Sequence, residues 1–189
     1  MVEDVKKSAI LVLVAILLCA SSIVVFPVCA FDEPVVRVKE GDWVEYDVLI
    51  EGKGSMPPTH DVTWMRMEVL AVQGTAFSTN VTTRYANGTI GCAIWPYNFT
   101  EGELGGWTII PANLSPGETF YDLARHTEEP ANVTIQSEEQ KTVMGASRTV
   151  IYGSDSFRHK TWDKATGVFL HAAERFKNIT NNGFIRFHF

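Results

Sequence analysis

From residue 42 onward, the chain is dominated by an alternation of apolar and polar side chains. In residues 42–51, Val44, Tyr46, Val48 and Ile50 fall on one side, and the acidic residues fall on the other. Successive side chains of a β-strand point to opposite faces, so this alternation is typical of a strand with one buried face. After residue 30, no stretch keeps a helical period of apolar residues for more than about two turns. The pattern therefore predicts a domain built from strands.

Ten segments of this kind are separated by turn-forming residues. Asn87-Gly88 is a strong signal for a tight hairpin. Residues 107–114 are ambiguous, because Pro111 excludes a regular helix there. We expect an all-β fold, namely an antiparallel curved sheet, sandwich or half-barrel of about nine or ten strands, preceded by an N-terminal apolar helix. The predicted strands are residues 42–51, 61–72, 76–85, 89–95, 118–123, 131–143, 147–152, 157–162, 168–176 and 184–189.

One hairpin can be predicted in register. Residues 163–168 suit a four-residue loop, because an aspartate at its start accepts backbone N–H groups and a glycine at its end adopts the left-handed conformation. This loop places Trp162 opposite Phe169, which is an aromatic cross-strand pair. The same register predicts that His159 and His171 lie on opposite faces of the hairpin.

The first 30 residues predict a targeting segment. Lys6-Lys7 precedes an unbroken apolar run, residues 10–20, and Val28-Cys29-Ala30 fits the small-x-small pattern of signal-peptide cleavage sites. Cleavage would leave a signal peptide of residues 1–30 and an extracytoplasmic β domain of residues 31–189. Alternatively, residues 8–28 are retained as a membrane anchor, which makes the membrane a partner. Both interpretations place the β domain outside the cytoplasm, since the two lysines remain inside.

Six Asn-x-Ser/Thr sequons support this location. Random placement in a chain of this composition would give roughly one such acceptor site. The excess predicts a glycosylated surface protein whose used asparagines face solvent. The acceptor residues are Asn80, Asn87, Asn98, Asn113, Asn132 and Asn178.

Charge argues against nucleic acid as a partner. The chain has 16 Lys+Arg against 22 Asp+Glu, a formal net charge of −6, and no basic run longer than Lys6-Lys7. Binding to phosphates needs a concentrated basic face, which this sequence does not supply.

No pattern predicts a catalytic centre, a metal site or a cofactor. The sequence has no nucleophile elbow and no phosphate-binding loop, and the glycines of residues 102–106 predict a flexible turn. Cys92 is the single cysteine after residue 30, and we expect it to be a small buried apolar residue. The histidines have no metal-ligand spacing; they are His60, His126, His159, His171 and His188.

The aromatic content leaves two interpretations open. Five Trp, 11 Phe and 5 Tyr can pack in the core and across strands, or some can line an apolar cavity on the concave side of the sheet. Methionines would be adaptable wall residues in such a cavity. The candidate lining residues are Trp43, Trp64, Met65, Met67, Trp95, Trp107 and Trp162.

Three stretches resemble uncharacterised exported β-rich proteins of archaea. They are residues 41–46 (GDWVEY), 107–114 (WTIIPANL) and 162–170 (WDKATGVFL). The last of them also resembles a hairpin of lipoprotein-carrier (LolA-like) half-barrels, in which a curved antiparallel sheet holds an acyl chain. The first resemblance implies an exported surface protein, and the second implies an apolar ligand.

Three functions follow from these observations. The leading hypothesis is a non-enzymatic, extracytoplasmic, N-glycosylated cell-surface domain with an envelope or interaction role. The alternative is a binding module for a lipid or other apolar ligand on the inner face of a curved sheet, and an enzyme is the third. A filled interior favours the first function, whereas a cavity of a few hundred Å³ lined by Trp and Met favours the second.

Overall fold

The computed structural model describes residues 33–51, 61–123, 130–155, 158–175 and 184–188. The chain divides into two compact units, Met1–Asp32 and Glu33–Phe189, and all described residues belong to the second. The predicted leader and its apolar helix, as well as Asn178, lie outside the described residues. Within the described part of the chain, no helix has the length and apolarity needed to cross a membrane.

The described residues contain strands and turns but no helix, so the prediction of an all-β antiparallel fold is confirmed. Strands appear at all ten predicted places, and in eight of them one or both ends are shifted by one to three residues. They are β1 (Trp43–Glu51), β2 (Val62–Gln73), β3 (Ala76–Tyr85), β4 (Ile90–Asn98), β5 (Thr119–Asp122), β6 (Ala131–Val143), β7 (Ala146–Ser154), β8 (Arg158–Asp163), β9 (Phe169–Arg175) and β10 (Phe184–His188).

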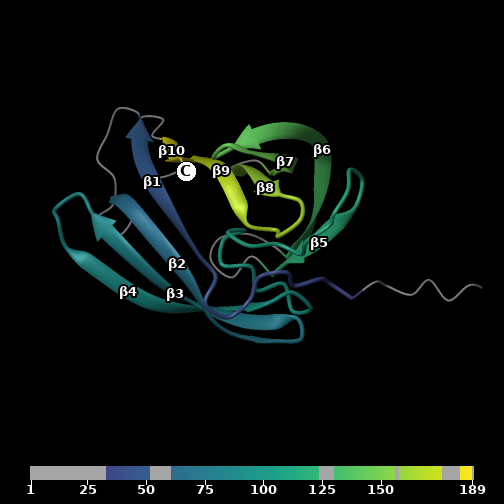
Figure 1. Ribbon diagram of the computed structural model, residues 1–189, viewed down its shortest axis with the longest axis horizontal. Coiled ribbons are helices and arrows are strands. Elements are labelled where there is room, and N and C mark those ends of the chain that lie inside the picture. Colours follow the sequence, from purple (N-terminus) through teal and green to yellow (C-terminus); the bar gives the residue numbers. More distant parts are fainter. Residues whose placement is uncertain (1–32, 52–60, 124–129, 156–157, 176–183, 189) are drawn as a thin grey trace, which may run out of the picture. The chain divides into compact units, whose positions relative to one another are not determined.

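The strands form a sheet in the order β4-β3-β2-β1-β10-β9-β8-β7-β6-β5 (Figure 1). Neighbouring strands are antiparallel, and most neighbours are also consecutive in the chain. The exception is β1, which pairs with the last strand, β10, and so joins β1–β4 to β5–β9. Short connections explain the pairing of β2 with β3, β3 with β4, β6 with β7 and β8 with β9, because antiparallel neighbours need only a tight turn between them.

Alternation in β1 and β2 separates a buried face from a charged face. Tyr46 lies opposite Met65, and both side chains are buried in the core. Their neighbours Glu45 and Arg66 point to the other face, where Arg66 Nη1 lies 3.0 Å from Glu45 Oε1. The apolar positions seen in the sequence therefore become the inner face of β1–β4.

Residues 104–112, here called the inserted segment, complete the core between β1–β4 and β5–β9. Trp107 and Ile110 are almost fully buried. The Phe169 N–H donates to the Thr108 carbonyl at 3.0 Å, and the Ile110 N–H donates to the Gly167 carbonyl at 3.0 Å. The segment thus binds through its backbone to the start of β9 and the turn before it.

Aromatic contacts join the two groups of strands. Tyr46 of β1 stacks on Phe169 of β9 with ring centroids 4.0 Å apart. From the inserted segment, Trp107 packs edge-on against Phe120 of β5 at 5.7 Å and lies 6.3 Å from Trp162 of β8. The interior is therefore closed by large side chains from both groups of strands.

The predicted β8–β9 hairpin is partly correct. Trp162 lies opposite Phe169 as expected, but a β-bulge between Thr161 and Trp162 shifts the register by one residue. His171 therefore lies opposite Thr161, and His159 lies two positions further along the same face. The prediction that these histidines lie on opposite faces is wrong, because one extra residue in a strand reverses the facing of all that follow.

Candidate functional site

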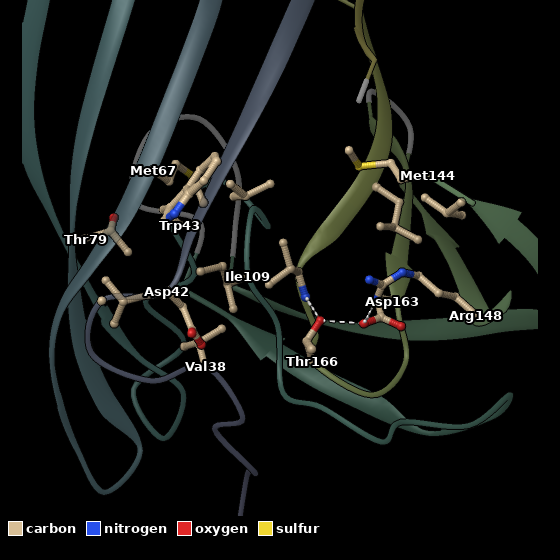
Figure 2. A pocket seen from close by; sticks show the side chains of 16 residues that line it. Val38, Asp42, Trp43, Met67, Thr79, Ile109, Met144, Arg148, Asp163 and Thr166 are labelled. Carbon is tan, nitrogen blue, oxygen red and sulfur yellow. Dashed lines mark hydrogen bonds and ion pairs between the residues drawn. The ribbon is translucent and has the colours of Figure 1, made fainter. Parts of the chain in front are cut away.

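A pocket of about 460 Å³ opens beside the inserted segment, between β1–β3 and the turn ends of β6–β9. Figure 2 shows Trp43 and Met67 on one side, Met144 and Arg148 on the other, and Ile109 between them. Most of its walls are apolar. The apolar lining residues are Val38, Trp43, Val44, Met67, Val69, Ile109, Val143, Met144, Val168 and Leu170.

The base of the pocket is rigid because it belongs to the core. Met67, Val69 and Ile109 line it and are also buried core residues. Val44 and Val168 are half-buried and pack against the same core. A ligand entering here would meet preformed apolar walls, which is typical of small-molecule sites.

The rim of the pocket carries exposed apolar side chains. Trp43 is 58% exposed and Met144 is 82% exposed. The Trp43 ring is held by the guanidinium of Arg66, which lies 4.2 Å from its centroid. Met144 has a flexible thioether side chain, which adapts readily to an irregular ligand surface.

Met144 also has an unusual backbone conformation. Val143 pairs with Ala146, so Met144 and Gly145 form a two-residue hairpin turn, with φ angles of 50° and 80°. Such turns favour Asn or Asp followed by Gly, because a positive φ is unfavourable for other side chains. Local strain of this kind persists where the surrounding structure or a function requires it.

The polar end of the pocket is an ion pair between a buried carboxylate, Asp163, and a partly exposed guanidinium, Arg148. The Asp163 carboxylate accepts a hydrogen bond from Arg148 Nη1 at 3.0 Å and another from the Thr166 hydroxyl at 2.8 Å. Asp163 is almost fully buried, and its charge is balanced by that of Arg148. Within this pair the two charges cancel. Asp42 also lines the pocket, and its carboxylate accepts the Lys39 N–H at 2.8 Å.

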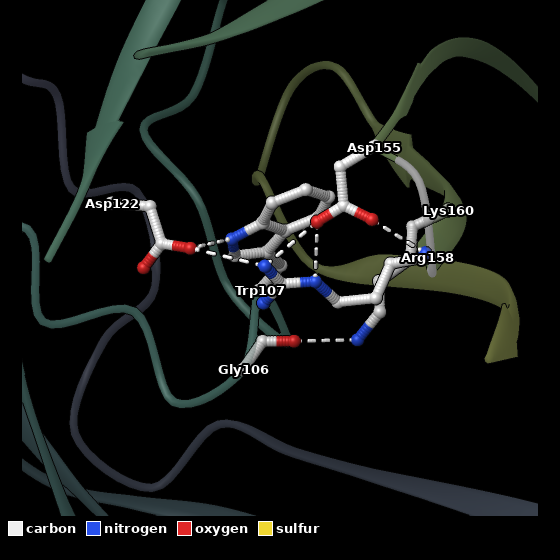
Figure 3. Close-up of polar contacts among 6 residues, drawn as sticks. All are labelled: Gly106, Trp107, Asp122, Asp155, Arg158 and Lys160. Atoms are coloured by element: carbon white, nitrogen blue, oxygen red, sulfur yellow. Dashed lines mark hydrogen bonds and ion pairs between the residues drawn. The ribbon is translucent and has the colours of Figure 1, made fainter. Parts of the chain in front are cut away.

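A second polar cluster surrounds Trp107 and holds the inserted segment in place (Figure 3). The Trp107 Nε1–H donates to Asp122 Oδ2 at 2.7 Å, and the Arg158 guanidinium lies 3.8 Å from the Trp107 ring centroid. Arg158 also pairs with Asp155 at 2.8 Å. The buried Lys160 donates to the Gly106 carbonyl at 2.5 Å. Each charged group of this cluster contacts the segment or another member, so the cluster's evident role is to anchor Trp107.

Burial perturbs two core tyrosines. Burial raises the pKa of Tyr97 to about 12, although the hydroxyls of Thr108 and Thr79 act in the opposite direction. Burial also raises the pKa of Tyr46 well above its usual value of 10, and the neighbouring Tyr97 adds to this effect. In both cases the folded protein favours the neutral phenol over the phenolate.

The fold should therefore lose stability in alkaline solution. The pKa of each tyrosine is higher in the folded than in the unfolded protein. The stabilisation that each neutral phenol contributes is therefore fully present below about pH 10 and is lost as the pH rises toward 12. We expect the free energy of unfolding to fall by up to about 1.4 kcal/mol per pH unit for each tyrosine. Urea titrations at pH 8, 10 and 11.5 measure this slope. Tyr97→Phe should make it shallower, whereas Tyr121→Phe, at an exposed position of β5, should not. Equal slopes for all three proteins would contradict this interpretation.

The structure brings only two of the predicted lining residues, Trp43 and Met67, into the pocket. Met65, Trp107 and Trp162 are buried in the core instead. Trp95 packs half-buried against the core, and Trp64 lies on the charged face, 5.7 Å from the Arg84 guanidinium. Trp107 and Trp162 therefore follow the packing interpretation, because both rings are needed to close the interior.

Several pocket residues were not predicted. Arg148, Asp163 and Met144 lie in or next to hairpin turns that meet only in the folded chain. One feature of the sequence could have pointed to Met144: Met144-Gly145 occupies a hairpin turn where Asn-Gly is the usual pair. Ile109 belongs to the ambiguous stretch around Pro111, whose buried position no alternation indicates.

Other predicted residues have clear positions. Of the sequon asparagines, Asn87, Asn113 and Asn132 are exposed, and Asn80 and Asn98 are half-buried. Cys92 is exposed, so the expectation that it is buried is wrong; it lies on the outer face of β4, opposite Thr82. The described residues contain no cluster of three or more His, Cys, Asp or Glu side chains that could hold a metal ion.

Comparisons of the chain with protein-family models, curated proteins and solved structures find no match.

Proposed function

We propose that this chain is an exported, non-enzymatic binding module that takes an uncharged apolar ligand in the pocket beside the inserted segment. The observation that carries the proposal is a preformed pocket of about 460 Å³ with largely apolar walls. Among the described residues that line it, Arg148 and Asp163 form the one ion pair, and their charges cancel. A volume of about 300–1,000 Å³ is usual for small-molecule sites.

The polar end favours an uncharged ligand over an anionic one. Arg148 is paired with Asp163, so an anion would have to compete with a buried carboxylate for the same guanidinium. Asp42 adds a negative charge to the lining and further disfavours anions. The ligand class that fits is a short hydrocarbon chain or an aromatic group with a neutral polar end.

This proposal retains the leading sequence hypothesis of a cell-surface domain with an envelope or interaction role, and it gives that interaction a site. The predicted leader and the sequons support an extracytoplasmic location. Three of the described sequon asparagines are exposed, which glycosylation requires. None of them lines the pocket.

A fluorescence titration tests the proposal with the uncharged apolar probe N-phenyl-1-naphthylamine and the protein in its natural processed form. We expect saturable binding that Met144→Asn weakens about tenfold, because part of the apolar rim is lost. The same variant should be more stable by about 0.5 kcal/mol, since Asn tolerates a positive φ. Loss of binding together with a gain in stability cannot be attributed to unfolding.

Leu70→Thr is the matched control, because Leu70 is an exposed apolar residue of β2 that does not line the pocket. All three proteins share the same amino terminus, so any probe bound there contributes equally. Absence of saturable binding, or equal affinities for Met144→Asn and the natural protein, would refute the proposed function.

A further inference from the structure

Strand β4 lies at one end of the strand order, so within the described part of the chain one of its edges pairs with no strand (Figure 1). The exception on this edge is an isolated bridge between Asn98, the last residue of β4, and Glu103. It is nine residues long, and its sequence IGCAIWPYN contains no charged residue. Natural proteins usually protect such an edge with lysines, a proline, a bulge or a very short strand, and β4 has one of these, Pro96, near its end. An uncharged edge of this length is a ready template for another strand.

The outer face of β4 presents an apolar stripe next to this edge. Ile90 is 59% exposed, Ile94 is 68% exposed, and Cys92 between them is also exposed. Residues two apart lie on the same face of a strand, so these three side chains form one row. On the neighbouring strand, Thr82 lies opposite Cys92, and Asn80 lies opposite Ile94.

The backbone groups of the same three residues point to the open edge. Tyr85 N–H donates to the Thr89 carbonyl at 2.9 Å, which makes this pair the first bonded pair of the β3–β4 hairpin. Bonded and non-bonded pairs alternate in an antiparallel ladder, so Ile90, Cys92 and Ile94 occupy the non-bonded positions toward β3. Pro96 also occupies a non-bonded position toward β3, so its lack of an N–H group costs no hydrogen bond between β3 and β4.

We propose that two copies of this protein associate through β4, as antiparallel strands related by a two-fold axis at Cys92. In this register Ile90 of each copy lies opposite Ile94 of the other, and the two Cys92 residues face each other. All three outward N–H groups and their carbonyls then find partners. The row is therefore complementary to itself, as a two-fold interface requires.

This register is preferred over its neighbours. With the axis at residue 93, Ile90 of each copy would lie opposite Pro96 of the other, which has no N–H to donate. A shift to residue 91 would leave Ile94 opposite the turn residue Gly88. Only the axis at Cys92 pairs the two isoleucines.

The dimer should be weak and dependent on concentration. Paired strands of nine residues bury much less than the about 1,200 Å² of a stable interface. The Cα atoms of a bonded antiparallel pair are about 5.5 Å apart, which lies within the range for a disulfide. Cys92 can therefore report the dimer through a cross-link between copies.

The cross-linking test uses the full chain with Cys19→Ser and Cys29→Ser, so that Cys92 is the one thiol. Dissolved oxygen with copper–phenanthroline is the oxidant: each thiol gives up its hydrogen, one S–S bond forms, and two electrons pass to oxygen. We expect covalent dimers at least tenfold faster than from a control with Cys92→Ser and Ser137→Cys, which places the thiol on the exposed part of β6. Equal rates would overturn the proposal.

Charge substitutions test the register. Ile94→Lys should abolish cross-linking and the dimer seen by sedimentation, because the lysine faces Ile90 of the other copy. The double variant Ile90→Glu with Ile94→Lys should restore both, because each glutamate then faces a lysine of the partner copy. Loss without restoration would show a nonspecific apolar face and would overturn the paired-strand arrangement.

A sugar on Asn80 could cover the same stripe. Asn80→Gln, in the same cysteine background, distinguishes this case. We expect the natural and substituted proteins from the same cells to dimerise alike. Dimerisation of the Asn80→Gln protein alone would mean that the sugar covers the stripe, and it would overturn the proposal for the natural protein. The dye titration at the pocket is independent of this result, because no β4 residue lines the pocket.

Discussion

Gly167→Ala is expected to destabilise the domain by about 3–5 kcal/mol, because two unfavourable effects coincide at this position. Gly167 has a φ of 75°, which is strained for any residue with a Cβ. An added Cβ would also overlap the carbonyl oxygen of Ile110, where the inserted segment crosses the β8–β9 turn. The segment or the turn would have to move to accommodate the methyl group.

Gly117→Ala is the matched control for backbone strain. Gly117 has a φ of 92°, but open space surrounds the position of its missing Cβ. We expect this change to cost only about 1–2 kcal/mol, from the left-handed backbone alone. Urea unfolding of both variants measures the difference. Equal losses would mean that the inserted segment does not press against the Gly167 turn, contrary to the packing described above.

Trp107→Ala should have the second large effect, a loss of about 3–5 kcal/mol in the free energy of unfolding. Trp107 is almost fully buried and contacts Phe120 and Trp162. Its removal leaves a cavity and deprives the buried Asp122 carboxylate of the indole N–H. The anchor of the inserted segment, and with it one wall of the pocket, would be weakened.

Trp64→Ala provides the comparison for a tryptophan outside the core. Trp64 is half-buried on the charged face, where its described ring partner is the Arg84 guanidinium at 5.7 Å. We expect a loss of about 1 kcal/mol, since such contacts are weak at exposed sites. Thermal unfolding of the two variants separates them. A Trp107→Ala protein as stable as the Trp64→Ala protein would contradict a core built around the inserted segment.

The strands were predictable because each reflects a local rule. Alternation along β1 and β2, and turn residues such as Asn87-Gly88, act within a few neighbouring positions. Both ends of β3 and of β6 were predicted to the residue. Antiparallel pairing of consecutive strands followed from the short turns between them.

The core and the pocket depend on contacts between distant residues, which alternation does not encode. Trp107 has a φ of 67° and lies in a glycine-rich turn, so no strand or helix pattern indicated that it fills the interior. The bulge in β9, opposite Thr161 and Trp162, reversed the predicted facing of His171, and a one-residue slip of this kind leaves no clear mark on the apolar pattern. Met144 and Trp43 line one pocket although they are 101 positions apart in the sequence.

Methionine methyl resonances test most directly whether an apolar ligand binds in the pocket. In protein labelled with methyl-¹³C methionine, N-phenyl-1-naphthylamine should shift the signals of Met67 and Met144, which line the pocket. The signal of Met65, which is buried two residues away but does not line the pocket, should stay in place. Unchanged signals for Met67 and Met144 under saturating probe, or a shift of Met144 alone, would contradict the account.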